Sequence, residues 1–149
     1  MARPIQTFEF REMIDVLGMS ATKAKNWTVG RPFKLEPSIR TASGQGSRNL
    51  YSMEDVYLLG IANDLSHAGM AAGAIGELVA ALKEKFSDGL AGVDTLYVTR
   101  GGNLTYRIEL RGDRLPADSV VRLSIDVTRL RRKVDQAVRR LRADQIGEP

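Results

Sequence analysis

The sequence contains no cysteine at any of its 149 positions. Disulfides, thiol nucleophiles, redox-sensing thiols and thiolate metal sites are therefore all excluded. The single histidine, His67, cannot form a histidine metal site by itself, and we expect it at the surface in the last turn of a helix. No metal ion or other cofactor is predicted.

Long apolar runs are also missing. No stretch approaches the roughly 18 apolar residues of a membrane-spanning helix, and residues 1–6 lack the apolar core of a signal peptide. We therefore expect a bacterial or phage protein of the cytoplasm with no membrane contact. No phosphate-binding loop, dinucleotide fingerprint or supported serine, histidine and aspartate arrangement is present, so we do not expect an enzyme.

What the chain does have is a globular composition, with 43% apolar and 27% charged residues. Its net charge of +4 is unevenly distributed. Residues 20–48 carry six cations and one anion, and residues 128–142 carry seven cations and one anion, so the rest of the chain carries −7. Two basic segments on an acidic body favour contact with a polyanion, although both could instead be solvated faces.

Hydrophobic periodicity predicts a helix over residues 8–17 and a second over residues 20–27. Between them, Gly18 suits a left-handed turn and Ser20 can cap the second helix through its hydroxyl. The second helix is expected to bury Ala21, Ala24 and Trp27. Its outward residues are then Thr22, Lys23, Lys25 and Asn26.

Two short strands, residues 38–41 and 48–51, are predicted to flank a loop of small residues that projects as a wing. Ser52 and Asp55 then form a capping box, with Asp in place of the usual Glu, for a third helix that Gly69 ends. A fourth, amphipathic helix is expected over residues 71–86. Helix, turn, helix and wing thus follow one another in the first half of the chain.

Beyond a glycine-rich boundary at residues 87–92, the apolar period changes from helical to alternating. Residues 95–99, 104–110 and 121–127 are predicted to form a three-stranded antiparallel meander. The last helix, residues 128–142, carries an apolar stripe that must cover either this sheet or a second chain. We assign the stripe to a dimer interface formed by Leu130, Val134, Ala137, Val138 and Leu141.

The predicted fold is therefore α+β: a winged helix-turn-helix domain over residues 1–86, followed by residues 93–149 with a small antiparallel β meander and a basic amphipathic helix. The second region would serve dimerisation or effector binding.

Residues 8 to about 82 resemble the MerR-like winged-helix DNA-binding domain. The resemblance is carried by the turn Leu17-Gly18-Met19-Ser20, a second helix ending in an aromatic residue, and a basic wing leading into Tyr51-Ser52-Met53-Glu54-Asp55-Val56. The chain departs from the family where a sheet, rather than a long coiled coil, follows the fourth helix.

The resemblance implies that Thr22, Lys23 and Lys25 meet the major groove and that Trp27 lies against the phosphate backbone. It also implies that Arg48, with Ser47 and Asn49, approaches phosphate or the neighbouring groove. The residue types fit, because lysine neutralises phosphate and Asn or Thr can hydrogen-bond base edges. The candidate DNA-binding residues are Thr22, Lys23, Lys25, Asn26, Trp27, Arg40, Gln45, Ser47, Arg48 and Asn49.

We therefore predict a homodimeric, sequence-selective regulator of transcription that binds an inverted repeat in double-stranded DNA. One alternative is a DNA architectural or packaging protein, similar to an excisionase or a small terminase subunit. Another is a protein-interaction adaptor that uses the C-terminal sheet and helix. The sequence specifies no operator, no direction of regulation and no small-molecule effector.

Overall fold

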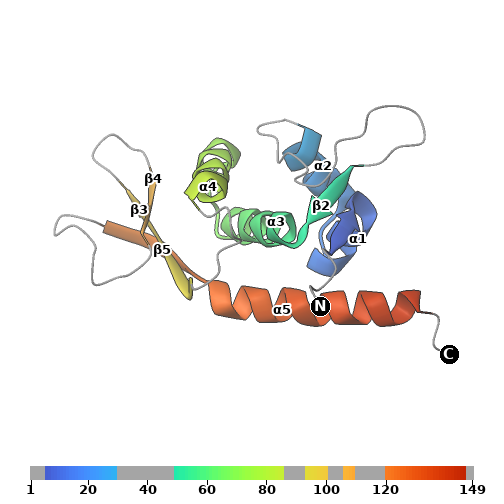
Figure 1. Ribbon diagram of the computed structural model, residues 1–149. Helices are drawn as coiled ribbons and strands as arrows, with labels where there is room; N and C mark the ends of the chain where they lie inside the picture. Colours follow the sequence, from blue (N-terminus) through green and yellow to red (C-terminus); the bar gives the residue numbers. More distant parts are fainter. Residues whose placement is uncertain (1–5, 30–48, 86–92, 101–105, 110–119, 147–149) are drawn as a thin grey trace.

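The computed structural model describes residues 6–29, 49–85, 93–100, 106–109 and 120–146 (Figure 1). Over these residues the chain has a mixed helix and sheet fold, with five helices, one two-stranded sheet and one three-stranded sheet, both antiparallel. None of the described helices is both long and apolar enough to cross a membrane.

The first described element is a strand that the sequence did not predict. Strand β1 (Thr7–Glu9) pairs antiparallel with β2 (Leu50–Ser52), and the fully buried Phe8 lies opposite Tyr51. Helix α1 (Phe10–Leu17) therefore starts later than predicted. The side chain of Glu12 accepts a 3.0 Å hydrogen bond from the Glu9 N–H, which satisfies a free donor at the start of the helix.

The turn after α1 follows the sequence prediction. Gly18 ends α1 in the left-handed conformation, with φ of 64°, and the next helix, α2 (Ala21–Val29), starts three residues later. The Ser20 hydroxyl accepts a 3.2 Å hydrogen bond from the backbone N–H of Lys23, as expected of a cap. Ala21 is exposed rather than buried, because only the side of α2 that carries Ala24 and Trp27 faces the core.

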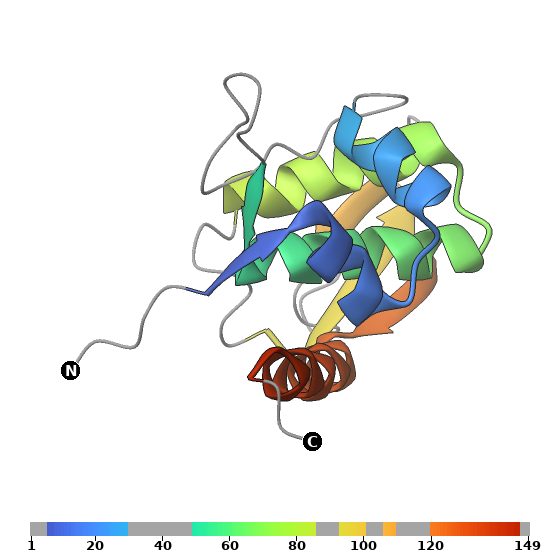
Figure 2. The same ribbon diagram turned by 90° about the vertical axis from the view of Figure 1, so that its right-hand side faces the viewer.

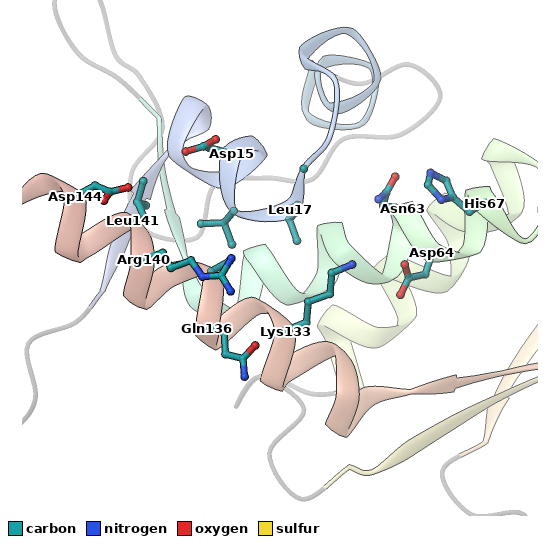
Figure 3. Close-up of a pocket in the computed structure, with 13 residues that line it drawn as sticks. Asp15, Leu17, Asn63, Asp64, His67, Lys133, Gln136, Arg140, Leu141 and Asp144 are labelled. Atoms are coloured by element: carbon teal, nitrogen blue, oxygen red, sulfur yellow. The ribbon is translucent and has the colours of Figure 1, made fainter.

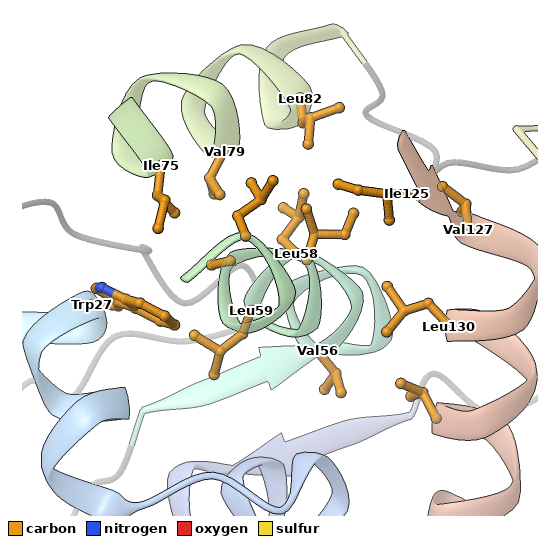
Figure 4. Packing of buried hydrophobic residues seen from close by; sticks show 14 of the residues in the cluster. Trp27, Val56, Leu58, Leu59, Ile75, Val79, Leu82, Ile125, Val127 and Leu130 are labelled. Carbon is orange, nitrogen blue, oxygen red and sulfur yellow. The ribbon is translucent and has the colours of Figure 1, made fainter. Parts of the chain in front are cut away.

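Helix α3 (Met53–His67) forms the centre of the molecule, and α4 (Ala72–Lys85) packs on it. The predicted capping box is confirmed. Ser52 Oγ accepts from the Asp55 N–H at 3.1 Å, and Asp55 Oδ2 accepts from the Ser52 N–H at 3.0 Å. Trp27 of α2 and Ile75 of α4 lie on one side of α3, and Leu130 lies on the other (Figure 4).

The C-terminal sheet contains β3 (Thr95–Arg100), β4 (Tyr106–Glu109) and β5 (Val120–Asp126) in the order β4-β3-β5. Three antiparallel strands are confirmed, but the meander order is wrong because β5 pairs with β3 instead of β4. The reason lies at the start of the last helix. The carbonyl of Asp94, just before β3, accepts hydrogen bonds from the N–H groups of Val127 and Thr128, which directly follow β5.

Helix α5 (Val127–Gln145) is capped by Asp126, whose Oδ1 accepts a 2.9 Å hydrogen bond from the Arg129 N–H. It packs along α1 and α3, on the side of the molecule opposite α2 (Figures 1 and 2). One hydrophobic cluster extends from Phe8 to Val138, so the two predicted domains share a core.

This packing corrects the assigned dimer interface. Leu130, Val134 and Val138 of the stripe are buried within the single chain. Leu141 packs against the core. Ala137 is half-buried. The stripe covers α1 and α3, a partner that a sequence pattern could not distinguish from a second chain.

Candidate nucleic-acid interface

Helix α2 is held firmly on one side. Ala24 is fully buried and Trp27 is 4% exposed, and both belong to the hydrophobic core. The hydroxyl of Thr28, also buried, donates a 3.0 Å hydrogen bond to the Ala24 carbonyl and is thereby satisfied inside the helix. Ala24 and Trp27 therefore anchor this side of α2 in the core.

The opposite side of α2 is polar and accessible. Thr22, Lys25 and Asn26 are exposed, as predicted. Lys23 is half-buried instead, because its Nζ donates a 3.0 Å hydrogen bond to Asn63 Oδ1 of α3 and lies 5.2 Å from the centre of the Trp27 ring. Lys23 therefore ties α2 to α3, which leaves Lys25 as the exposed lysine of this helix.

The other predicted DNA contacts fall into three groups. Trp27 was expected to lie against a phosphate backbone, but its burial makes it an anchor of α2 instead, with almost no surface left for a ligand. Arg40, Gln45, Ser47 and Arg48 lie outside the described residues. Asn49 is half-buried directly before β2.

A second basic surface lies on α5. Five of its cations are exposed, namely Arg129, Arg132, Lys133, Arg139 and Arg140. The other two have partners within the chain. Arg131 donates to the Val93 carbonyl at 2.7 Å, and Arg142 donates to the Thr7 carbonyl at 2.7 Å and to Glu12 Oε2 at 3.0 Å. The basic segment thus divides into cations that hold the fold and cations that face solvent.

Between α1, α3 and α5 lies an open cleft of about 690 Å³ (Figure 3). Lys133 and Arg140 extend into it from α5, while Asp64 and His67 border it from α3. Burial raises the pKa of Asp64 above its ordinary value, and the positive charges of Lys133 and His67 oppose that rise. The sequence could not predict this cleft, because it forms only where α5 packs on α1 and α3, which are distant from α5 in the sequence.

The contacts between α5 and the body are polar as well as apolar. The Tyr57 hydroxyl of α3 donates a 2.7 Å hydrogen bond to Asp135 Oδ1 of α5. Burial and this bond together raise the pKa of Tyr57 above its ordinary value. Near the other end of α5, Arg142 lies 4.9 Å from the centre of the Phe8 ring. These contacts hold α5 against α3 and β1, and so determine the side of the molecule on which its exposed cations lie.

The described residues hold no group of three or more His, Asp or Glu side chains that could bind a metal ion. Two surfaces of the described residues carry exposed cations that suit an anion: the polar side of α2 and the basic side of α5. No known family model matches the chain, and no curated protein matches it in sequence.

Proposed function

We propose that the protein is a DNA-binding regulator of transcription, in which α1, α2, the residues leading into β2, and α3 form a winged helix-turn-helix unit. The observation that supports this most is the two-sided character of α2. Ala24 and Trp27 anchor one side in the core, while Thr22, Lys25 and Asn26 are exposed on the other. A rigid helix with a short polar exposed side suits insertion into a major groove.

In this proposal each exposed side chain has a distinct task. Lys25 neutralises a phosphate, and Thr22 and Asn26 hydrogen-bond base edges. Lys23 positions α2 through Asn63 rather than contacting DNA strongly. Arg48 and its neighbours in the wing would add phosphate contacts. Because α2 carries no arginine to grip a guanine, we expect modest discrimination between sequences.

A homodimer on an inverted repeat belongs to the same proposal. Its interface must lie elsewhere than on Leu130, Val134 and Val138, since these side chains are already buried within one chain. Two copies of α2 related by two-fold symmetry would then reach successive major grooves, about 34 Å apart.

The test is fluorescence anisotropy with a random duplex and with the upstream region of the protein's own gene, each across a salt series. We expect Lys25→Ala to weaken binding roughly fivefold at 0.15 M salt and to lower the slope of log K against log salt by about 0.9, because one phosphate contact is lost. An unchanged slope would contradict the assignment of Lys25.

Two variants serve as controls. Lys25→Arg keeps the charge and should retain the wild-type slope. Arg11→Ala removes an exposed cation from α1 rather than α2 and should also leave the slope unchanged. A strong preference for the upstream region would indicate regulation of the protein's own gene, whereas equal affinity for both duplexes would favour the architectural alternative.

A further inference from the structure

We propose that the exposed side of α5 is a second DNA-binding surface, which lets one protein molecule bridge two segments of duplex DNA. The proposal rests on the proposed function for the first segment, bound by α2, and adds a separate site for the second. It concerns the five exposed cations of α5 named above, which we call the α5 basic face: Arg129, Arg132, Lys133, Arg139 and Arg140.

The fold does not account for these cations. Within the described residues, no salt bridge or hydrogen bond engages the guanidinium group of Arg129, Arg132, Arg139 or Arg140. By contrast, Arg131 and Arg142 hold α5 to the body through hydrogen bonds. Five long cationic side chains on one helix repel each other unless a polyanion or salt neutralises them.

The spacing of the α5 basic face fits a duplex. At about 3.6 residues per turn, Arg132 and Arg139 fall on one side of Gln136, and Arg129 and Arg140 fall on the other. Gln136 is exposed and lies at the edge of the cleft between α1, α3 and α5 (Figure 3). A helix with side chains is about 10–12 Å in diameter, which fits a major groove about 12 Å wide. The two arginine rows would then reach the phosphates on either side, with Gln136 toward the base edges.

Acidic groups near this face lie at its border. Asp15, Asp64 and Asp144 line the cleft beside Lys133 and Arg140. Asp135 is half-buried and accepts the Tyr57 hydrogen bond. Asp126 caps the helix through its contact with the Arg129 N–H. Asp135 stands three residues after Arg132 and four before Arg139, so the acid beside this row in the helix is one whose carboxylate already accepts the Tyr57 hydroxyl.

Other anionic partners fit less well. Membrane binding by a basic helix requires an apolar side that enters the lipid, but the apolar residues Leu130, Val134 and Val138 are buried in the core. Only Ile146, just beyond the end of the helix, is a large apolar side chain exposed among the described residues. A protein partner would usually find aromatic or apolar anchors, which the α5 basic face lacks. Duplex DNA needs only phosphate contacts.

The position of α5 makes the site separate from α2. Helices α1 and α3 lie between α2 and α5 in both views (Figures 1 and 2). A straight duplex held by α2 therefore cannot also lie along α5. A second segment, on the same DNA molecule or another, must occupy the α5 basic face.

A capture assay tests the proposal. One duplex is fixed to beads, the protein is added, and retention of a second, fluorescent duplex is measured across a salt series. We expect the wild-type protein to retain the second duplex. We expect Arg132→Gln with Arg139→Gln to reduce retention at least about tenfold at 0.15 M salt, because two phosphate contacts are lost. The same pair changed to lysine keeps the charge and should retain the second duplex.

The outcomes separate this proposal from the proposed role of α2. Retention that is unchanged in the glutamine variant overturns the α5 site, and so does single-duplex binding without any retention of a second. Equal competition by polyglutamate and by duplex DNA also overturns it. If Lys25→Ala binds DNA normally while the glutamine variant does not, α5 holds DNA and α2 does not. Bridging by a dimer through two copies of α2 would persist in the glutamine variant, which again overturns the α5 site.

Discussion

At the scale of single residues, Glu12 joins three parts of the chain. Its carboxylate accepts hydrogen bonds from the Glu9 N–H at 3.0 Å, from Arg142 at 3.0 Å, and from the Gln145 amide. Burial by itself would raise the pKa of Glu12, but the Glu9 N–H, Gln145 and Arg142 together hold that pKa below its ordinary value of 4.5. Folding therefore favours the ionised form of Glu12.

This shift predicts an acid-dependent loss of stability. Because the folded-state pKa of Glu12 is lowered, its contribution is fully present above about pH 4.5 and is lost as the pH falls through the folded-state value. We expect Glu12→Gln to reduce the free energy of unfolding by about 1 kcal/mol at pH 7, a value discounted for partial exposure. The difference from wild type should shrink below pH 4.5, as measured by urea denaturation at each pH.

The matched control is Glu77→Gln, the same change at an exposed position of α4. It should alter stability by less than about 0.5 kcal/mol. A deficit of Glu12→Gln that stays constant from pH 7 to pH 3 would contradict the role given to the ionised carboxylate.

At the scale of elements, a single glycine sets how closely α3 approaches its neighbours. Gly60 is buried in the middle of α3, and a Cβ placed there would lie 3.2 Å from Leu130 of α5 and 3.2 Å from Leu17 of α1. Glycine in a helix interior costs about 1 kcal/mol relative to alanine. At position 60 the absence of a side chain lets α1 and α5 pack closely against α3, which offsets this cost.

We expect Gly60→Val to lower the free energy of unfolding by about 2 kcal/mol, because a branched side chain would overfill this contact. Gly73→Val in the first turn of α4 is the control, since a Cβ at Gly73 meets nothing within 4 Å. It should change stability by less than about 0.5 kcal/mol. Thermal or urea unfolding compares the two, and an equal effect of both substitutions would show that backbone propensity, not packing, limits position 60.

At the scale of the whole molecule, α5 completes a core that begins at Phe8. Val134 of α5 is 2% exposed and Trp27 of α2 is 4% exposed, and both belong to one hydrophobic cluster. A shared core should unfold as a unit. The chain contains one tryptophan, Trp27, so tryptophan fluorescence reports on the part of the core around α2.

Unfolding measured by Trp27 fluorescence should therefore respond to a change in α5. We expect Val134→Ala to lower the free energy of unfolding by about 2 kcal/mol, with coincident fluorescence and circular-dichroism transitions. Since Val134 packs within one chain, the loss should not depend on protein concentration. A fluorescence transition unmoved by Val134→Ala would indicate two independent domains. If the loss in free energy of unfolding depends on protein concentration, Val134 instead lies in a dimer interface.

Local sequence patterns were sufficient to predict several elements of this fold. Gly18 at the left-handed turn, Ser20 at the start of α2, and the Ser52 and Asp55 capping box are each decided by neighbours within three or four residues. The same holds for the polar side of α2, whose exposure follows from helical periodicity once Ala24 and Trp27 face the core. The proposed site on α2 was therefore visible in the sequence.

What only the tertiary structure decided concerns partners far apart in the chain. Periodicity showed that Leu130, Val134 and Val138 share one side of α5, but it could not show that α1 and α3 of the same chain cover them. The pairing of β1 with β2 and of β3 with β5 likewise depends on contacts between distant residues. Sequence spacing fixes which side chains share a face, because that is local geometry. Which surface buries the face depends on the packing of the whole chain.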